Sequence, residues 1–332
     1  MIRLFAPFVP EKAIEAVAEV LRTPWLGQGY KVQEFEEQLS FLGENVLTVN
    51  SGTSALELAY DLLDLKQGDE VIVPVFTAVA TSLPLVRRGV RVVFADVTDK
   101  MLMDWDDALL KITDKTRAIV NVHLFGLYNK APACPVPIIG DACQYLDKTE
   151  GELFTAYSFQ ATKIITTGDG GALVCRDRGD YERAKLLRWY GIDRETGIDN
   201  VLVDIKEAGY KYHMNDVTAA LGLAALPLLS KQKAHRLEVQ KVYNEVFPSG
   251  GSPFLIHVWD REAIIKRLAA RGVEAGMVHR RNDIYSVFGG VRRALPKMNW
   301  LESHYMFLPC HNSLSIYHAK FISSLITHDD LL

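Results

Sequence analysis

The chain has 332 residues, of which 48% are hydrophobic and 23% charged, and 37 Lys and Arg against 41 Asp and Glu give a formal net charge of -4. This is an ordinary globular composition, and it excludes disordered, collagen-like and coiled-coil proteins. At about 100–200 residues per domain, the length suits two domains. The slight excess of acid argues against a nucleic-acid-binding surface, which needs clustered basic residues.

No segment of the sequence predicts membrane insertion or secretion. The longest apolar stretch, 219–229, contains Pro227 and is too short to span a bilayer. The opening MIRLFAPFVPEK lacks the apolar core of a signal peptide. We therefore expect a cytoplasmic protein without a membrane partner.

The cysteines and histidines predict neither a disulfide framework nor a metal site. The histidines show no HExxH motif, and the cysteines lack the close spacing of zinc ligands. We expect four reduced thiols, at Cys134, Cys143, Cys175 and Cys310.

Between residues 50 and 176 the sequence alternates between helical and strand-like patterns. A helix is expected over 51–65, where capping residues precede apolar residues at helical spacing, and another over 77–89. Short apolar runs predict strands at 46–50, 70–74, 90–96, 117–123, 137–141, 153–159 and 171–175. Apolar strands separated by helices predict an α/β protein whose mainly parallel central sheet is flanked by helices.

The pattern changes after Tyr190. The chain is polar as far as residue 200, and a helical pattern then runs from Asn215 to about residue 247. Residues 248–253 have the composition of a linker, and 253–278 predict a small β-α-β unit. We therefore divide the chain into a large domain, 1–235, and a small C-terminal α/β domain, 236–332.

Polar residues at the ends of the predicted strands are the first candidates for a site, because ligands of such sheets bind at the carboxyl ends of strands. Asp141 and His123 each end an apolar run, and Ser158 lies within another. Residues 51–54 open a helix with small hydroxyl side chains, which suits a phosphate, although such residues are more often simple caps. Asp141, taken alone, also fits a cap.

Lys163 has an unusual setting in SFQATKIITTGDGG, where small and β-branched residues surround it. A desolvated lysine has a lowered pKa and becomes a nucleophile, whereas the alternative is an ordinary lysine in an exposed loop. Further on, 209–226 joins a polar aromatic loop to a helix rich in Ala and Gly. Such a helix fits either a core or a subunit interface. No GxGxxG motif follows any predicted strand, which excludes a dinucleotide-binding enzyme of that type.

Five motifs in one order resemble those of the DegT/StrS-type nucleotide-sugar aminotransferases, which depend on pyridoxal 5'-phosphate (PLP) and have the type I aminotransferase fold. They are SGTSALELA, VIVPVFTAVAT, GDACQ, SFQATKIITTGDGG and GYKYHMNDVTAALGL. The resemblance runs from about residue 23 to about residue 230 and is looser in the small domain. It implies PLP as the cofactor.

The resemblance also implies roles for individual residues in holding PLP. Lys163 stands at the Schiff-base lysine and is expected to shuttle protons as well. Asp141 matches the acid that keeps the pyridine nitrogen protonated, which makes the ring an electron sink. Gln144 matches the residue that contacts the ring hydroxyl.

By the same resemblance, three parts of the chain are expected to bind the phosphate of PLP. Thr53 and Ser54 match the start of the phosphate-binding helix, and Ser158 matches a further phosphate ligand. Asn215 matches a residue that reaches the phosphate from the neighbouring subunit. The resemblance therefore implies a homodimer with shared active sites.

The chain departs from the family where an aromatic ring usually stacks on the cofactor. Ala78 occupies that position, and Phe76 lies two residues earlier. Either Phe76 or another ring covers the cofactor, or the stacking is weaker. One branch of the family replaces the lysine with histidine and removes a sugar hydroxyl, and Lys163 argues against that branch.

By resemblance, the reaction moves an amino group from an amino acid, glutamate in most relatives, to a keto group of a nucleotide-linked sugar. A 4-keto-6-deoxy or 3-keto sugar is expected, for an amino sugar of a surface polysaccharide or a glycosylated metabolite. The alternative is a PLP-binding regulatory or sensory homologue without turnover. The candidate substrate contacts combine aromatic, Arg and polar side chains: Trp25, Gln28, Arg188, Trp189, Tyr190, His213, His279, Asn282 and Tyr285.

Overall fold

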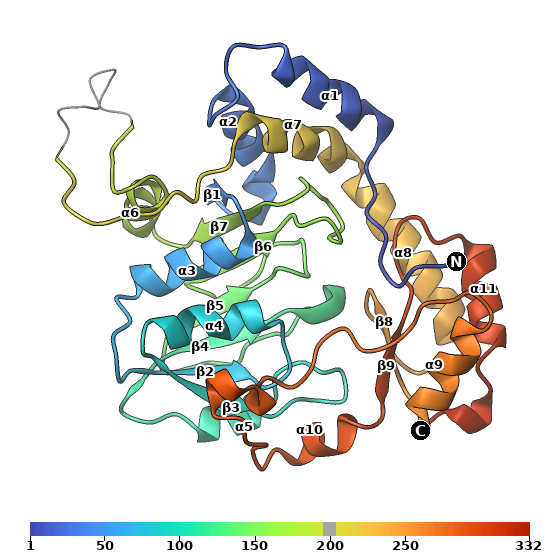
Figure 1. Ribbon diagram of the computed structural model, residues 1–332. Coiled ribbons are helices and arrows are strands. Elements are labelled where there is room, and N and C mark those ends of the chain that lie inside the picture. The colour runs from blue at the N-terminus through green and yellow to red at the C-terminus, as the bar shows by residue number, and fades with distance from the viewer. Residues whose placement is uncertain (195–203) are drawn as a thin grey trace.

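The computed structural model describes residues 1–194 and 204–332, so the last part of the polar stretch expected to end at residue 200 lies outside the described residues. Seven strands form one sheet in the order β1-β7-β6-β5-β4-β2-β3 (Figure 1). The strands are β1 (Asn45–Val49), β2 (Glu70–Pro74), β3 (Arg91–Ala95), β4 (Thr116–Val122), β5 (Ile138–Asp141), β6 (Phe154–Ser158) and β7 (Gly171–Cys175). Each lies within two residues of a run that the sequence predicts.

The sheet is mainly parallel, which confirms the predicted class. β2 pairs in parallel with β3 and β4, β4 with β5, and β5 with β6. β7 is antiparallel to both β6 and β1. The connection from β6 to β7 contains no crossover helix, and without one a strand can return only in the antiparallel direction. Lys163 lies in this connection.

Helices cover both faces of the sheet, as the alternate side chains of β1 show. Leu47 and Val49 pack in one core with α3 (Gly52–Leu62), whereas Val46 packs in another with α2 (Tyr30–Gln38). Successive side chains of a strand point to opposite faces, so a strand buried on both faces is apolar throughout. The other helices of this region are α1 (Glu11–Leu21), α4 (Val79–Arg87), α5 (Trp105–Leu110) and α6 (Arg178–Arg188).

The long helical pattern from Asn215 is two helices. α7 (Asp216–Ala225) and α8 (Leu229–Asn244) are separated by one 3-10 turn at Leu226–Leu228. Pro227 lies in that turn, and proline lacks the N–H that a continuous α-helix would need there. α8 then runs from the large sheet towards the second sheet (Figure 1).

The C-terminal part of the chain has its own two-stranded sheet of β8 (Phe254–His257) and β9 (Tyr305–Leu308). The two strands are antiparallel. The predicted β-α-β unit is wrong in its last strand, because β8 pairs with β9 and not with residues 273–278. Residues 273–278 form only isolated bridges, one to Ile2 and one to Phe307. The helices here are α9 (Arg261–Ala269), α10 (Pro296–Leu301) and α11 (Ile316–Ser324).

A separate core fills this C-terminal part, from Val239 on α8 to Ile326. α8 passes through residue 235 without a break, and Ile2 pairs with Val273 although it stands at the start of the chain. The division into 1–235 and 236–332 stays a prediction. No helix among the described residues is long and apolar enough to cross a membrane.

Candidate active site

Three predicted site residues lie at the carboxyl ends of neighbouring strands of the large sheet. Asp141 is the last residue of β5, Ser158 is the last of β6, and His123 follows β4. Because these three strands are parallel, their carboxyl ends lie side by side. A cavity of about 480 Å³ opens here, and Cys143, Gln144, Ser158, Lys163 and His279 are among its lining residues. We call it the lysine cavity.

Lys163 is half-buried in the turn after β6, where its backbone N–H donates to the carbonyl of Gln160 at 2.9 Å. No acid in residues 1–194 and 204–332 forms an ion pair with its ammonium group. A lysine held in this way, in a mostly apolar cavity, is suited to act as a nucleophile or base.

Asp141 is 5% exposed, and two neutral groups bind its carboxylate. The hydroxyl of Thr81 donates to Oδ2 at 2.7 Å, and the backbone N–H of Cys143 donates to Oδ1 at 3.1 Å. Within the described ranges no cationic side chain pairs with this acid. A buried carboxylate without a cation fits a protonated ring nitrogen as its missing partner.

The start of α3 reaches the same place. Ser51 caps the helix, accepting a hydrogen bond from the N–H of Ser54 at 3.0 Å, and the hydroxyl of Ser54 donates to Asn50 at 2.6 Å. Thr53 is exposed, so its hydroxyl is available to a ligand. The first N–H groups of a helix have no partner within it and attract an anion.

Gly52 lets this backbone come unusually close to the cavity wall. A Cβ added there would lie 2.6 Å from Sγ of Cys143 and 2.9 Å from Cβ of Ser158. Only glycine permits such an approach. Gly52 thus holds the first N–H groups of α3 close to Ser158, and these groups with the hydroxyls of Thr53 and Ser158 form a cradle that fits a phosphate.

Cys143 lines the lysine cavity but is not among the residues predicted from the sequence. Burial and the Asp141 carboxylate raise the pKa of its thiol well above the usual value, although Lys163 acts in the opposite direction. The thiol is therefore neutral at ordinary pH. Its position within GDACQ was the available signal, since it lies between the two predicted residues Asp141 and Gln144.

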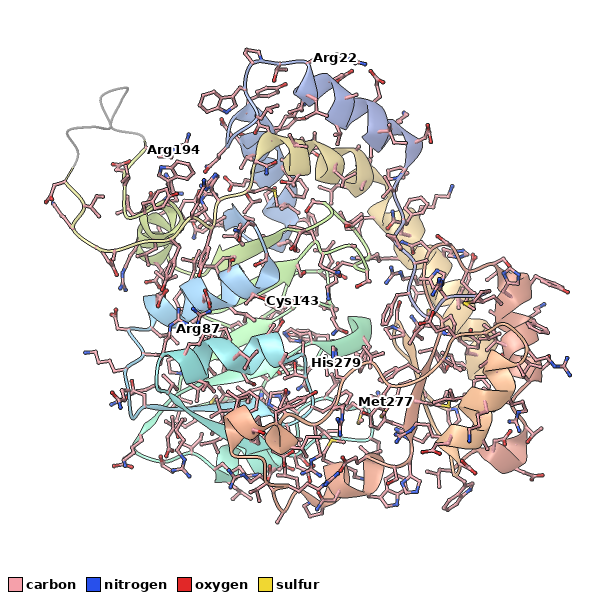
Figure 2. All side chains as sticks on the ribbon, in the orientation of Figure 1. Arg22, Arg87, Cys143, Arg194, Met277 and His279 are labelled. Carbon is pink, nitrogen blue, oxygen red and sulfur yellow. The ribbon has the colours of Figure 1, made fainter. Side chains whose placement is uncertain are left out.

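His279 brings the C-terminal part of the chain into the lysine cavity. Figure 2 shows it near Cys143, between the large sheet and the second sheet. Burial, and to a lesser extent Lys163, lowers the pKa of its imidazole to about 4, so the ring is neutral at ordinary pH. Nε2 of the neutral ring accepts a hydrogen bond from the side-chain amide of Gln144 at 2.9 Å.

Phe76 lies behind His279. It is fully buried, does not line the lysine cavity, and contacts the imidazole at 5.9 Å between ring centroids, with the rings inclined at 67°. Phe125 lies on another side of the same imidazole at 6.2 Å and 22°. His279 lines the lysine cavity, as do the rings of Phe5, Phe125 and Tyr145, whereas Phe76 does not.

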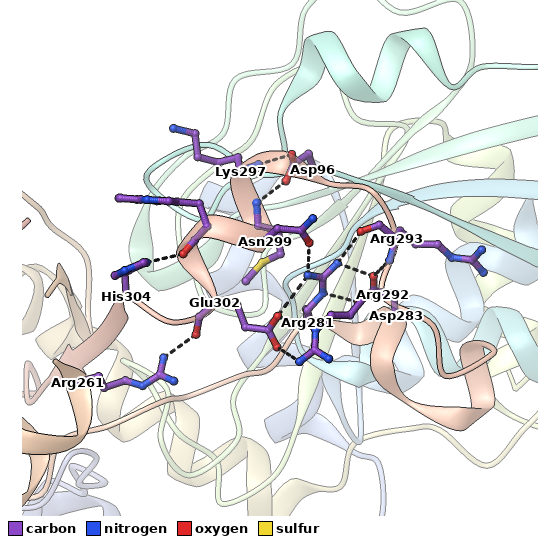
Figure 3. A network of polar contacts seen from close by, with 12 residues as sticks. Asp96, Arg261, Arg281, Asp283, Arg292, Arg293, Lys297, Asn299, Glu302 and His304 are labelled. Atoms are coloured by element: carbon purple, nitrogen blue, oxygen red, sulfur yellow. Dashed lines mark hydrogen bonds and ion pairs between the residues drawn. The ribbon is translucent and has the colours of Figure 1, made fainter. Parts of the chain in front are cut away.

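A buried ionic network holds the segment that carries His279 (Figure 3). The guanidinium of Arg281 is fully buried and donates to both oxygens of Asp283 at 2.7 Å, and Nη1 donates to Asn299 at 2.5 Å. Next to it, Asn282 donates its backbone N–H to Val75 at 2.6 Å and its side-chain amide to Thr77 at 2.9 Å. Asn282 is therefore a support beneath the cavity, and the half-buried Tyr285 follows it.

The remaining candidate substrate contacts gather elsewhere, around a second cavity of about 870 Å³ that we call the α6 cavity. Gln28, Arg188 and Trp189 line it. Arg188 is 5% exposed, pairs with Glu36 at 2.7 Å and donates to the carbonyl of Thr48 at 2.8 Å. Its charge is already balanced within the chain.

Aromatic residues continue along this second region. Trp25 is 54% exposed and Tyr190 is 40% exposed. His213 contacts Trp189 at 3.9 Å between ring centroids, and burial together with Arg188 lowers its pKa to about 4. Asn215 caps α7, where its Oδ1 accepts the N–H of Thr218 at 3.0 Å. Within one chain, these residues do not line the lysine cavity.

The lysine cavity and the residues that border it fit PLP on three independent grounds. Asp141 supplies a buried acid without a cation, Lys163 supplies an ammonium without an acid, and the start of α3 supplies a cradle for a phosphate. These are the groups that a PLP enzyme uses to hold the ring nitrogen, the aldehyde carbon and the phosphate. Together with the mainly parallel sheet, they define a PLP-dependent aminotransferase of the type I fold.

Comparison with known proteins agrees. Residues 8–260 match the model of the DegT/DnrJ/EryC1/StrS aminotransferase family, so the chain belongs to that family. It is 30% identical over 318 residues to a UDP-4-amino-4-deoxy-L-arabinose--oxoglutarate aminotransferase of Shewanella sediminis, covering 82% of each chain. It is 31% identical over 277 residues to a dTDP-4-dehydro-2,3,6-trideoxy-D-glucose 4-aminotransferase of Saccharopolyspora spinosa, covering 74% of this chain and 71% of that one.

Solved structures give the same result. AtS13 of Actinomadura melliaura has a TM-score of 0.90 at 33% identity, over 98% of both chains. PseC of Helicobacter pylori, an aminotransferase involved in the biosynthesis of pseudoaminic acid, has a TM-score of 0.86 at 25% identity, over 97% of both chains. The protein is a PLP-dependent nucleotide-sugar aminotransferase of sugar biosynthesis.

Proposed function

We propose that the enzyme takes an amino group from glutamate and transfers it to the keto group of a nucleotide-linked sugar. The sugar would be a 4-keto-6-deoxy sugar or a 3-keto sugar. The product would be an amino sugar for a surface polysaccharide or a glycosylated metabolite. The observation that carries the proposal is the position of Lys163 in the lysine cavity, with Asp141 and the start of α3 both in contact with Cys143 in the wall of that cavity.

Each of these residues has a distinct task in the proposal. Bound PLP supplies an electron sink that stabilises negative charge at the reacting carbon. Asp141 keeps the ring nitrogen protonated through a charge pair shielded from water. Lys163 would anchor the cofactor and, through its Nζ, would hold and move the proton of the reacting carbon.

The other predicted residues orient the cofactor. Gln144 contacts the ring hydroxyl, and its amide is held by His279 at 2.9 Å and by the N–H of Phe125 at 3.2 Å. Thr53, Ser54 and Ser158 bind the phosphate with the N–H groups that open α3. His279, which lines the same cavity and accepts a hydrogen bond from Gln144, would hold that amide in place.

We further propose a homodimer in which each subunit completes the other's site. The α6 cavity carries the candidate substrate contacts Gln28, Arg188 and Trp189 and is separate from the lysine cavity within one chain. Aromatic rings suit sugar faces, so this region would serve the nucleotide sugar bound to the partner's PLP, with Arg188 held in its wall by Glu36. Asn215 would reach the partner's phosphate.

The absorbance spectrum of the PLP-loaded protein, recorded with and without glutamate, tests the proposal. We expect the visible band of lysine-bound PLP to disappear on addition of glutamate and to return when a keto-sugar nucleotide is added. A band that no amino acid changes would contradict the proposal and favour the regulatory alternative. Absence of any band after addition of PLP would overturn the assignment of the cofactor site.

A further inference from the structure

α8 forms a wall of the lysine cavity that no function has been assigned to. Lys233, Arg236 and Gln240 of this helix line the same cavity as Lys163, and Ser252 from the following segment joins them. Figure 1 shows α8 beside the large sheet, on the way to the second sheet. The cavity therefore has cationic residues on two different elements.

Arg236 is bound by neutral groups only. Its Nε donates to Oδ1 of Asn312 at 2.9 Å, and its Nη1 donates to the hydroxyl of Ser252 at 3.0 Å. Among residues 1–194 and 204–332 no carboxylate pairs with it, and its Nη2 makes no hydrogen bond within this part of the chain. Since a guanidinium has five N–H donors, several remain for a ligand.

Burial lowers the pKa of Arg236, because a cation removed from water and lacking an acid partner is destabilised. A group of this kind gains most from an anion that brings the missing negative charge. The planar guanidinium fork matches a carboxylate, with which it can form two parallel hydrogen bonds.

Lys233, one turn earlier on α8, provides the contrast. Its ammonium group donates to the carbonyl of Leu146 at 2.7 Å and to Oδ1 of Asp147 at 2.5 Å. Asp147 is the one acidic residue among the described residues that line the cavity, and it is used in this pair. The cations of the cavity that remain unbalanced are thus Lys163 and Arg236.

The rest of the cavity and its size favour an amino acid over the nucleotide sugar. Apolar residues line the cavity together with the two cations, among them Phe5, Ile164 and Leu237. The volume of about 480 Å³ must also hold the cofactor ring. A nucleotide sugar carries a base, a ribose and a pyrophosphate beyond the reacting sugar, so most of it has to lie outside. A small dicarboxylic amino acid fits inside.

We propose that Arg236 binds a carboxylate of the amino donor, and of the 2-oxo acid formed from it, while the donor's amino group faces Lys163. The ligand class is a short dicarboxylic amino acid such as glutamate. This inference rests on the proposed function of the lysine cavity and adds the residue that selects the donor.

Calorimetric titration of the PLP-loaded enzyme with glutarate, a dicarboxylate that has no amino group and does not react, tests the proposal. Loss of a charge-assisted hydrogen bond predicts that Arg236→Met weakens glutarate binding about 10- to 100-fold. Arg236→Lys, which keeps the charge but lacks the fork, is expected to lose less. Titration with dTDP and UDP is expected to give the wild-type result in both variants.

Asn312→Ala is the matched control, because it removes a structural partner of Arg236 and leaves the guanidinium in place. It is expected to bind glutarate as the wild type does. Unchanged glutarate binding in both Arg236 variants would overturn the proposal. So would a loss confined to dTDP and UDP, which would assign Arg236 to the pyrophosphate.

Failure of this proposal can be told apart from failure of the proposed function, because glutarate binding does not require turnover. If the PLP-loaded enzyme failed to respond to every amino acid, the proposed function would fail, while glutarate affinity would still report on Arg236. If the enzyme converted glutamate normally and Arg236→Met did the same with an unchanged glutamate KM, the carboxylate site alone would be wrong.

Discussion

The lysine cavity and the α6 cavity both contain charged residues, but the charges are balanced differently. At the α6 cavity, Arg188 pairs with Glu36 at 2.7 Å and Arg178 pairs with Glu182, whereas Arg194 lies over the ring of Trp189 at 4.8 Å. At the lysine cavity, Lys163 and Arg236 have no acid partner among the described residues. Asp141 has no cationic partner there either.

The difference has a physical meaning. A charge removed from water without a partner costs stability, and it persists where a ligand or reaction supplies the opposite charge. A paired charge has already been used to join two elements of the fold. We therefore propose that the unbalanced charges of the lysine cavity take part in the chemistry of this enzyme, and that the paired charge of Arg188 stabilises its fold. Each substitution below tests that distinction.

Lys163→Ala is expected to have the largest effect. Removing the group that anchors PLP and moves the proton should lower transfer activity by at least about 10²- to 10⁴-fold and abolish the visible band of lysine-bound PLP. Lys233→Ala removes a paired lysine from the same cavity and is the matched control. Equal losses in the two variants, measured as half-reaction rates with glutamate, would break the comparison.

Asp141→Asn should follow. Asparagine keeps the shape and the contact with Thr81 but cannot stabilise a protonated ring nitrogen. A charge pair of this kind is worth a few kcal/mol, so we expect the rate to fall about 10²- to 10³-fold. Stopped-flow absorbance with glutamate measures it. A variant as fast as the wild type would show that this acid does not face the ring nitrogen.

Arg188→Met should act on stability instead of chemistry. It leaves the carboxylate of Glu36 without its buried partner, which costs about 3–5 kcal/mol of the free energy of unfolding. Denaturant titration measures this loss, and the visible band of bound PLP at low denaturant is expected to be unchanged. Loss of bound PLP without a loss of stability would contradict this expectation, because it would place Arg188 in cofactor binding.

Gly52→Ala should have a smaller and more local effect. The added Cβ meets Cys143 at 2.6 Å, and such overpacking costs about 1–3 kcal/mol. We expect weaker PLP binding as well, since relief of this clash moves the start of α3 away from Ser158. Introducing Cys143→Ala as a second change should recover part of the loss, because it removes the nearest atom. Thermal unfolding with and without PLP gives both quantities, and an additive double variant would argue against the contact.

The last prediction concerns the pH dependence of the free energy of unfolding. One histidine in each of the two regions should contribute to it in the same direction. The pKa values of His279 and His213 are lowered from 6.5 to about 4 in the folded protein. The unfolded chain therefore binds these protons first, so stability falls as the pH drops from 6.5 towards 4 and is fully present above 6.5. His279→Gln and His213→Gln should each flatten this slope in urea titrations. A slope that neither variant alters would contradict the assignment.

The sequence predicts most of the large sheet because its strands are buried on both faces and read as continuous apolar runs. β2 agrees with the prediction at both ends, since Pro74 ends the run. The C-terminal part was predicted less well. Residues 273–278 have strand-like composition, but β8 pairs with β9, which lies about 50 positions further along the chain. Such distant pairing leaves no local pattern.

The candidate site divides in the same way. Lys163, Asp141 and Gln144 stand in short motifs, and each lies where a strand end places it. Arg236 has no motif, because its isolation depends on the absence of nearby acids in three dimensions. His279 could be selected from the sequence, but its contacts with Gln144 and Phe76 join segments far apart in the chain.

Reduction of the PLP-loaded enzyme with borohydride, followed by peptide mass spectrometry, tests the central claim most directly. The reagent fixes PLP to the lysine that holds it. We expect the label on the peptide that contains Lys163, and none on the peptide that contains Lys233. A label on Lys233 or on any other lysine would show that the unbalanced charges of the lysine cavity do not mark the catalytic centre.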